Sequence, residues 1–153
     1  MTAPAPQAVD TFFPFSAQSI SNAQWQAYVR MFRTDGIVNS DLAGTTAYNV
    51  ADGGGLVAQV AAGRAIVQGI FAENATQKNF TLGTADATNP RIDTVILRLT
   101  QATPTVQLAV LEGVAAASPV PLALTQNAAV YEVPLSFIRI NAASGSLTSL
   151  TDC

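Results

Sequence analysis

The sequence has 153 residues, of which 49% are hydrophobic and only 11% are charged, and its formal net charge is −3. It contains no histidine and one cysteine, which excludes imidazole bases, histidine metal ligands and disulfides within the chain. The seven Lys and Arg residues are scattered, so no basic surface for a phosphate backbone is expected and we predict no nucleic-acid partner.

The beginning of the chain lacks the basic region and the apolar run of a secretory signal. No apolar stretch in the sequence approaches the roughly 20 residues that cross a bilayer. We therefore predict a protein that is made in a cytoplasm and has no membrane insertion. The lone Cys153 is interpreted as an inert thiol at a frayed end of the chain.

Residues 1–17 combine three prolines with the aromatic cluster Phe12, Phe13 and Phe15. This stretch contains too much proline for a helix and is too aromatic for a solvated tail. We predict an extended arm whose phenylalanines contact a second subunit or a partner. The alternative is that they pack on the chain's own core.

One amphipathic helix is predicted after Ser21, because Ser21 and Gln24 have the spacing of a capping box. Asp35-Gly36 is expected to end this helix. The sequence contains no second helix to receive the apolar face, so we predict that it packs against copies of itself in other subunits, the alternative being its own sheet. The apolar face consists of Trp25, Tyr28, Val29 and Phe32, and Gln26, Arg30 and Arg33 point away from it.

From Gly36 onward, hydrophobic residues alternate with polar ones in short runs separated by turn residues, which is typical of an all-β sandwich or barrel. Two of the runs are predicted to pair as a hairpin around 61–63, and two others as a hairpin around the four-residue loop 101–104. The strands are expected at 44–50, 56–60, 64–71, 78–82, 92–100, 105–112, 130–140 and 146–150.

Two features interrupt the predicted strand pattern, a proline within a strand and a long stretch between strands. Pro134 cannot donate a hydrogen bond within a sheet, so its strand is predicted to lie at an edge or to contain a bulge there. The stretch 113–127 is predicted to be a long connection that is either functional or laid across a partner.

Paired carboxylates are the one catalytic arrangement that this composition allows, and Asp93 could face Glu112 or Glu132 across strands. Arg91 precedes Asp93 by two residues on the same face of a strand, so we interpret these two as an ion pair. We predict that the protein is not an enzyme and has no cofactor and no metal.

A carbohydrate-binding β-sandwich used in host attachment is the alternative function, since such domains hold sugars on aromatic platforms. The sole tryptophan, Trp25, falls on the predicted helix, and Tyr48 and Tyr131 are isolated in the sequence.

Several segments together resemble the N-terminal attachment domain of tailed-bacteriophage baseplate-upper, tail-fibre and minor tail proteins. The resemblance covers roughly residues 12–152 and implies a non-enzymatic β-domain that joins a fibre or receptor-binding region to the tail tip as a symmetric homo-oligomer. The family continues beyond this domain whereas the sequence stops at Cys153, so an adaptor or decoration role is expected rather than binding of a host receptor. The segments are Trp25–Gly36, Val57–Gly69, the strand Arg91–Leu99, Leu111 with Gly113, Ser118–Pro121, Leu124-Thr125 and Tyr131–Leu135.

The sequence as a whole thus predicts a mainly β protein, with an antiparallel β-sandwich or barrel-like domain at 37–153 preceded by an arm and helix at 1–36. We expect a structural virion protein of a phage tail, made in the host's bacterial cytoplasm, whose partners are copies of itself, with a trimer favoured, and neighbouring tail or baseplate proteins. The predicted interaction residues are Phe12, Phe13, Phe15, Trp25, Tyr28, Val29 and Phe32.

Overall fold

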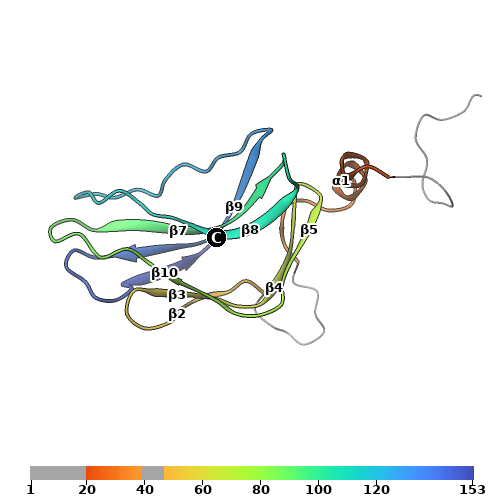
Figure 1. Ribbon diagram of the computed structural model, residues 1–153. Coiled ribbons are helices and arrows are strands. Elements are labelled where there is room, and N and C mark those ends of the chain that lie inside the picture. The colour runs from red at the N-terminus through yellow and green to blue at the C-terminus, as the bar shows by residue number, and fades with distance from the viewer. Residues whose placement is uncertain (1–19, 39–46) are drawn as a thin grey trace, which may run out of the picture.

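The computed structural model describes residues 20–38 and 47–153. Within these ranges the chain forms one helix and ten strands, and every strand pairing is antiparallel. Figure 1 shows the helix at one end of the β-domain, beside β5. The elements are α1 (Asn22–Arg30), β1 (Gly36–Ile37), β2 (Val50–Asp52), β3 (Val57–Val60), β4 (Gly63–Val67), β5 (Ile70–Asn74), β6 (Lys78–Thr81), β7 (Arg91–Thr100), β8 (Thr105–Leu111), β9 (Val130–Ile140) and β10 (Ser149–Asp152).

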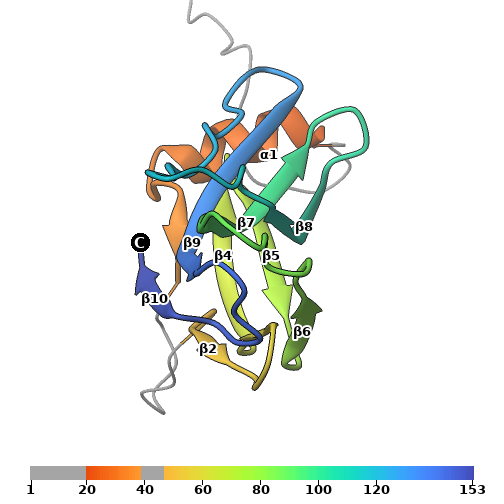
Figure 2. The same ribbon diagram turned by 90° about the vertical axis from the view of Figure 1, so that its left-hand side faces the viewer.

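Two layers of sheet enclose the core, as the two views in Figures 1 and 2 show. One layer is a four-stranded sheet with the order β10-β9-β7-β8. The other contains two three-stranded sheets, with the orders β1-β4-β5 and β2-β3-β6. The prediction of a mainly β, sandwich-like domain is therefore confirmed.

The core lies between the layers and follows the two-residue period of the strands. In β7, the side chains of Val95, Leu97 and Leu99 are 0–1% exposed and face the opposite layer. Ala58 of β3 and Val67 of β4 are fully buried on the other side. Burying an aliphatic side chain of this size stabilises the fold by about 1.5–3 kcal/mol, so these alternating positions account for much of the stability.

The hairpin expected at 92–112 is confirmed, with Thr100 opposite Thr105 across the loop 101–104. Where β7 pairs with β9, Val95 lies opposite Ser136 and Ile96 lies opposite Pro134. Leu135 of β9 is therefore an extra residue without a partner in β7. The bulge predicted at Pro134 is therefore present. The edge position is not, because β9 lies between β10 and β7.

The hairpin predicted around residues 61–63 is wrong, because β3 and β4 belong to different sheets. The chain crosses between sheets at Ala61-Ala62, and the run expected as one strand at 64–71 turns back at Gln68-Gly69 to form the hairpin β4–β5. Gln68 and Gly69 both have positive φ, 50° and 77°, as the two central residues of a type I′ hairpin turn require.

Three predicted boundaries also differ. The strand expected at 44–50 is found at Val50–Asp52, with a turn at residues 47–48 before it. Helix α1 stops at Arg30 rather than at Asp35-Gly36, because the Asp35 carboxylate accepts hydrogen bonds from the backbone and side-chain nitrogens of Gln68, and this draws the chain down toward β1. The last strand lies at Ser149–Asp152 rather than 146–150, since Ser144 and Ser146 form a hydrogen-bonded turn that delays it.

The long connection predicted at 113–127 is present and runs over the outer side of the four-stranded sheet (Figure 1). Beneath it, Thr94 and Ile96 on the outer face of β7 are fully buried. The backbone N–H of Ala116 donates to the carbonyl of Pro90 at 3.0 Å, which fixes the first part of the connection.

Candidate interaction surface

The start of α1 has the predicted capping box. The backbone N–H of Gln24 donates to Ser21 Oγ at 3.3 Å, and the N–H of Ser21 donates to Gln24 Oε1 at 3.0 Å. Two backbone donors that the first turn cannot satisfy are thereby paired. The cap defines where the helix begins and therefore which side chains share each of its faces.

The polar face of α1, not its apolar face, lies toward the domain. Gln26 and Arg30 border a hollow of about 590 Å³ together with Gln68 and Gln101, and Arg30 donates a hydrogen bond to Gln68 Oε1. An amphipathic helix of a self-sufficient domain normally turns its apolar stripe to the core. The orientation of α1 is the reverse of that rule.

The apolar face is accordingly turned outward. Trp25 is 50% exposed, Tyr28 38% and Phe32 69%, while Val29 is half-buried. The three rings contact one another, with centroid distances of 5.9 Å between Trp25 and Tyr28 and 5.1 Å between Tyr28 and Phe32. Ile20 and Met31 extend the exposed apolar area at either end. Trp25, Tyr28 and Phe32 thus form one aromatic surface on α1 and the turn that follows it.

The remaining predicted interaction residues, Phe12, Phe13 and Phe15, lie outside the described residues. The sequence predicted Trp25, Tyr28, Val29 and Phe32 as one apolar stripe, and their role as interaction residues stays a prediction. It did not foresee that Gln26 and Arg30, expected to point away, are the residues that seat the helix on its own domain.

The candidate catalytic carboxylates are each held by cationic or backbone donors. Asp93 is fully buried, and its Oδ1 accepts from Arg91 Nε at 3.0 Å and from the backbone N–H of Gly113 at 2.8 Å. The predicted Arg91–Asp93 ion pair is therefore confirmed. Glu112 is 60% exposed and lies 3.8 Å from the Arg91 guanidinium.

Glu132 has a similar fixed role on the outer face of the same sheet. Its side chain is 3% exposed, and its Oε1 accepts from Arg98 at 2.8 Å. Its other oxygen accepts from the backbone N–H of Thr125 at 2.6 Å. Asp93 and Glu132 thus hold the two ends of the long connection against β7 and β9.

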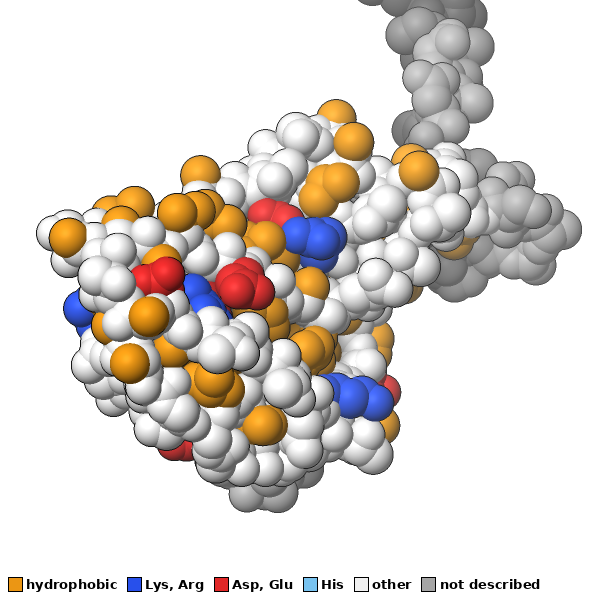
Figure 3. Space-filling model, turned by 60° about the vertical axis from the view of Figure 1, so that its left-hand side comes forward, with side chains coloured by type: hydrophobic (Ala, Val, Ile, Leu, Met, Phe, Trp, Pro, Cys, Tyr) orange, Lys and Arg blue, Asp and Glu red, His pale blue; other side chains and the backbone are white. Residues whose placement is uncertain are grey.

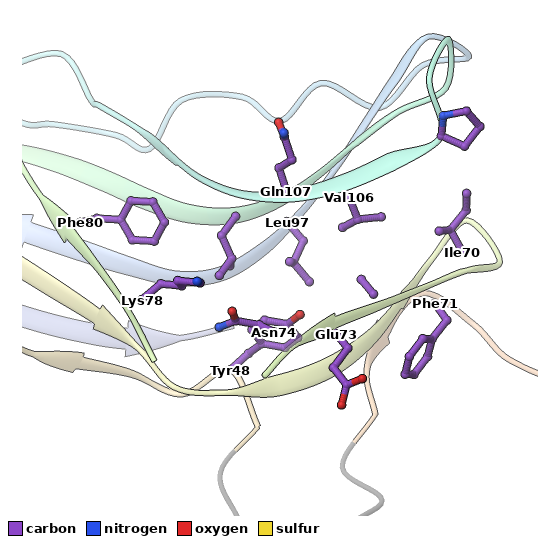
Figure 4. Close-up of a pocket in the computed structure, with 13 residues that line it drawn as sticks. Tyr48, Ile70, Phe71, Glu73, Asn74, Lys78, Phe80, Leu97, Val106 and Gln107 are labelled. Carbon is purple, nitrogen blue, oxygen red and sulfur yellow. The ribbon is translucent and has the colours of Figure 1, made fainter. Parts of the chain in front are cut away.

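A cavity of about 640 Å³, drawn in Figure 4, opens between β5, β6 and β8. Ile70, Leu97, Val106 and Phe80 point into it, whereas Gln107 points away. The sequence analysis missed this cavity because it forms between strands of three different sheets. No local pattern could have indicated it.

Tyr48 closes the floor of the cavity and is 3% exposed. Burial and the nearby Glu73 carboxylate raise the pKa of its phenol, while a backbone hydrogen bond at Asn74 opposes the shift. Its backbone φ is +54°, and Gly63 packs directly against its backbone nitrogen. Tyr48 is therefore a structural residue of the cavity wall rather than an exposed platform.

Two further properties concern residues 20–38 and 47–153. No group of three or more Cys, Asp or Glu side chains there is placed to hold a metal ion. Among the helices of that part of the chain, none has the length and hydropathy needed to span a bilayer. The sequence matches no protein-family model and no curated protein.

Proposed function

We propose that this chain is a structural assembly protein that associates with copies of itself through the apolar face of α1. The proposal rests on one observation. The polar face of α1 lies on the domain, whereas Trp25, Tyr28 and Phe32 point outward. Clustered aromatic side chains are enriched at protein interfaces, where they become the residues that contribute most to binding.

The composition of the surface supports the same proposal. With 11% charged residues, the chain has few groups that keep an isolated domain soluble. On the face shown in Figure 3, charged side chains form a few separate groups among uncharged ones. Closed symmetric homo-oligomers are the common outcome of self-association, and a trimer around α1 is the arrangement we favour.

We further propose that the assembly is part of a bacteriophage tail, at the tail tip, the baseplate or the base of a fibre, with neighbouring tail proteins as additional partners. The resemblance to phage attachment domains supports this step. Residues of its more specific segments make buried contacts in this structure. Arg91 and Asp93 form the buried ion pair, and Glu132 accepts the hydrogen bond that anchors the long connection.

The geometry supports binding to protein better than binding to sugar. A sugar site needs an exposed aromatic face beside polar groups. In the cavity, Tyr48 is buried and the side chain of Gln107 is turned away. The exposed rings of α1 instead contact one another edge to face or tilted, as in a packing surface.

Sizing of two matched variants tests self-association through α1. Phe32→Ala removes a 69% exposed ring from the α1 face, and Phe71→Ala removes a 55% exposed ring from β5, outside that face. We expect Phe32→Ala to weaken assembly about 30-fold, the equivalent of about 2 kcal/mol for an important interface residue, and Phe71→Ala to leave it unchanged. Light scattering that finds the unaltered chain monomeric at micromolar concentration, or both variants equally affected, contradicts the proposal.

The phage assignment needs a separate experiment. Antibodies raised against the purified chain are expected to label one end of the tail in particles produced from the genome that encodes it. Labelling of no particle, or of the host cell alone, contradicts a place in the virion while leaving self-association through α1 intact.

A further inference from the structure

One side of the sandwich is open where three edge strands meet. In the described part of the chain, β5, β6 and β8 each stand last in their sheet, and their residues line the 640 Å³ cavity. Edge strands carry backbone N–H and C=O groups that have no neighbouring strand. Ile70, Val106, Leu97 and Phe80 line the space between these edges with apolar surface (Figure 4). Polar side chains, Glu73, Asn74 and Lys78 among them, line the cavity as well. A slot of this mixed character between strand edges suits an extended peptide, whose backbone can pair with the edges.

We propose that residues 10–15 of the chain's own N-terminal arm occupy this cavity, with the side chains of Phe13 and Phe15 inserted between β5 and β8. Successive side chains of an extended segment point to opposite sides, so Phe13 and Phe15 share one face and Phe12 lies on the other. Phe12 then faces outward and stays free to contact a partner. The inference stands independently of the proposed function, because it concerns a contact within one chain.

The position of α1 places the arm at one end of the slot. The helix rests on the turn Gln68-Gly69, which leads directly into Ile70 at one end of the cavity. In Figure 2 the beginning of α1, the red end of the helix, lies on the β8 side of the domain. Phe15 lies five residues before Ile20, so the extended chain between them spans about 17 Å.

Charge favours the same direction of the arm. Asp10 is the one charged side chain among residues 1–19 of the sequence. Lys78 lies beside Phe80, at the end of the cavity away from Ile70 (Figure 4), and within the described residues it forms no ion pair. Asp10 lies five positions before Phe15, about 17 Å away in extended chain. An arm that enters at Ile70 therefore brings Asp10 toward Lys78.

Disulfide trapping in the full chain tests the contact. In a Cys153→Ser background, Val106→Cys is combined in turn with Phe12→Cys, Phe13→Cys or Phe15→Cys. We expect Phe13→Cys or Phe15→Cys to form a disulfide with position 106 within one chain at least tenfold faster than the matched control Phe12→Cys, seen as a faster-migrating monomer without reductant. Covalent dimers instead of monomers assign the slot to a second copy's arm and overturn the proposal. Absence of trapping, or equal rates at all three positions, overturns it as well.

Thermal melting gives a readout that does not require new cysteines. Phe15→Ala is expected to lower the melting temperature at every protein concentration, and Phe12→Ala is expected to lower it less than half as much. Asp10→Lys should also lower it, and adding Lys78→Asp should restore most of the loss. Equal effects of Phe12→Ala and Phe15→Ala contradict the proposal. A failure of self-association changes none of these comparisons, because all of them report on one chain.

Discussion

Gln26 of α1 lies directly over Gly69 of the β4–β5 turn, so closely that a Cβ at position 69 would stand 2.5 Å from the Gln26 carbonyl oxygen. Gly69 also has a φ of +77°, which side chains rarely adopt. This glycine therefore meets two requirements at once: it turns the hairpin and it lets the helix approach. The outward orientation of Trp25 and Phe32 depends on that approach.

Replacement of Gly69 tests this contact. Gly69→Ala is expected to unseat α1 and to destabilise the domain by more than Gly54→Ala, because Gly54 has a similar φ of +88° with nothing within 4 Å of its Cβ position. The backbone term alone costs about 1–2 kcal/mol in both variants. Urea unfolding measures the difference, and equal destabilisation by the two variants contradicts the close contact between α1 and the turn.

The buried Arg91–Asp93 pair leads to a second prediction. Asp93→Asn leaves the Arg91 guanidinium, 5% exposed, without its buried counter-charge, and breaking such a pair costs about 3–5 kcal/mol. Glu112→Gln changes the exposed carboxylate 3.8 Å from the same guanidinium and should cost less than about 1 kcal/mol. Chemical denaturation of both variants checks the ranking. Similar losses for the two carboxylates would show that Asp93 does not anchor the fold.

Glu132 is predicted to control the long connection rather than the whole fold. Glu132→Gln weakens the bonds to Arg98 and to the Thr125 backbone, so residues 113–127 should become several-fold more sensitive to thermolysin in the native state. Glu73→Gln, which alters the half-exposed pair with Arg64, is the control and should leave cleavage in that segment unchanged. The cleavage sites are identified by mass spectrometry.

Alkaline pH should reveal the buried phenol of Tyr48. Its folded-state pKa is raised, mainly by burial, above the ordinary value of 10.0. A raised pKa contributes stability that is fully present below pH 10 and is lost as the pH rises through the folded-state value. Tyr48→Phe should therefore lose less stability than the unaltered chain as the pH rises above about 10, with Tyr131→Phe as the control. Parallel pH profiles of the unaltered chain and Tyr48→Phe would contradict the burial of an ionisable phenol there.

Local patterns were enough to predict several elements of the structure. The capping box at Ser21 and the alternation on either side of residues 101–104 specify their elements through contacts between near neighbours in sequence. Pro134 predicted the bulge for the same reason, because its missing N–H is a property of one residue.

Other features depend on contacts that no local pattern contains. The run 64–71 is rich in small and apolar residues on both sides of Gln68-Gly69. Its sequence therefore looks like one strand and did not show that the chain reverses there. Ala61-Ala62 looks like a short turn, yet it carries the chain from one sheet to another. The orientation of α1 was hidden in the same way, because Gln26 and Arg30 are seated by Gly69 and Gln68, roughly 40 residues along the chain.

The emission of Trp25 as a function of protein concentration is the most direct test of assembly through α1. Trp25 is the only tryptophan, and it is 50% exposed in the single chain, so its spectrum reports on whether another surface covers it. We predict blue-shifted emission at high concentration and a red shift on dilution, with the same midpoint as the fall in mass measured by light scattering. Emission that does not change with concentration, together with the mass of a monomer throughout, would contradict self-association through this helix.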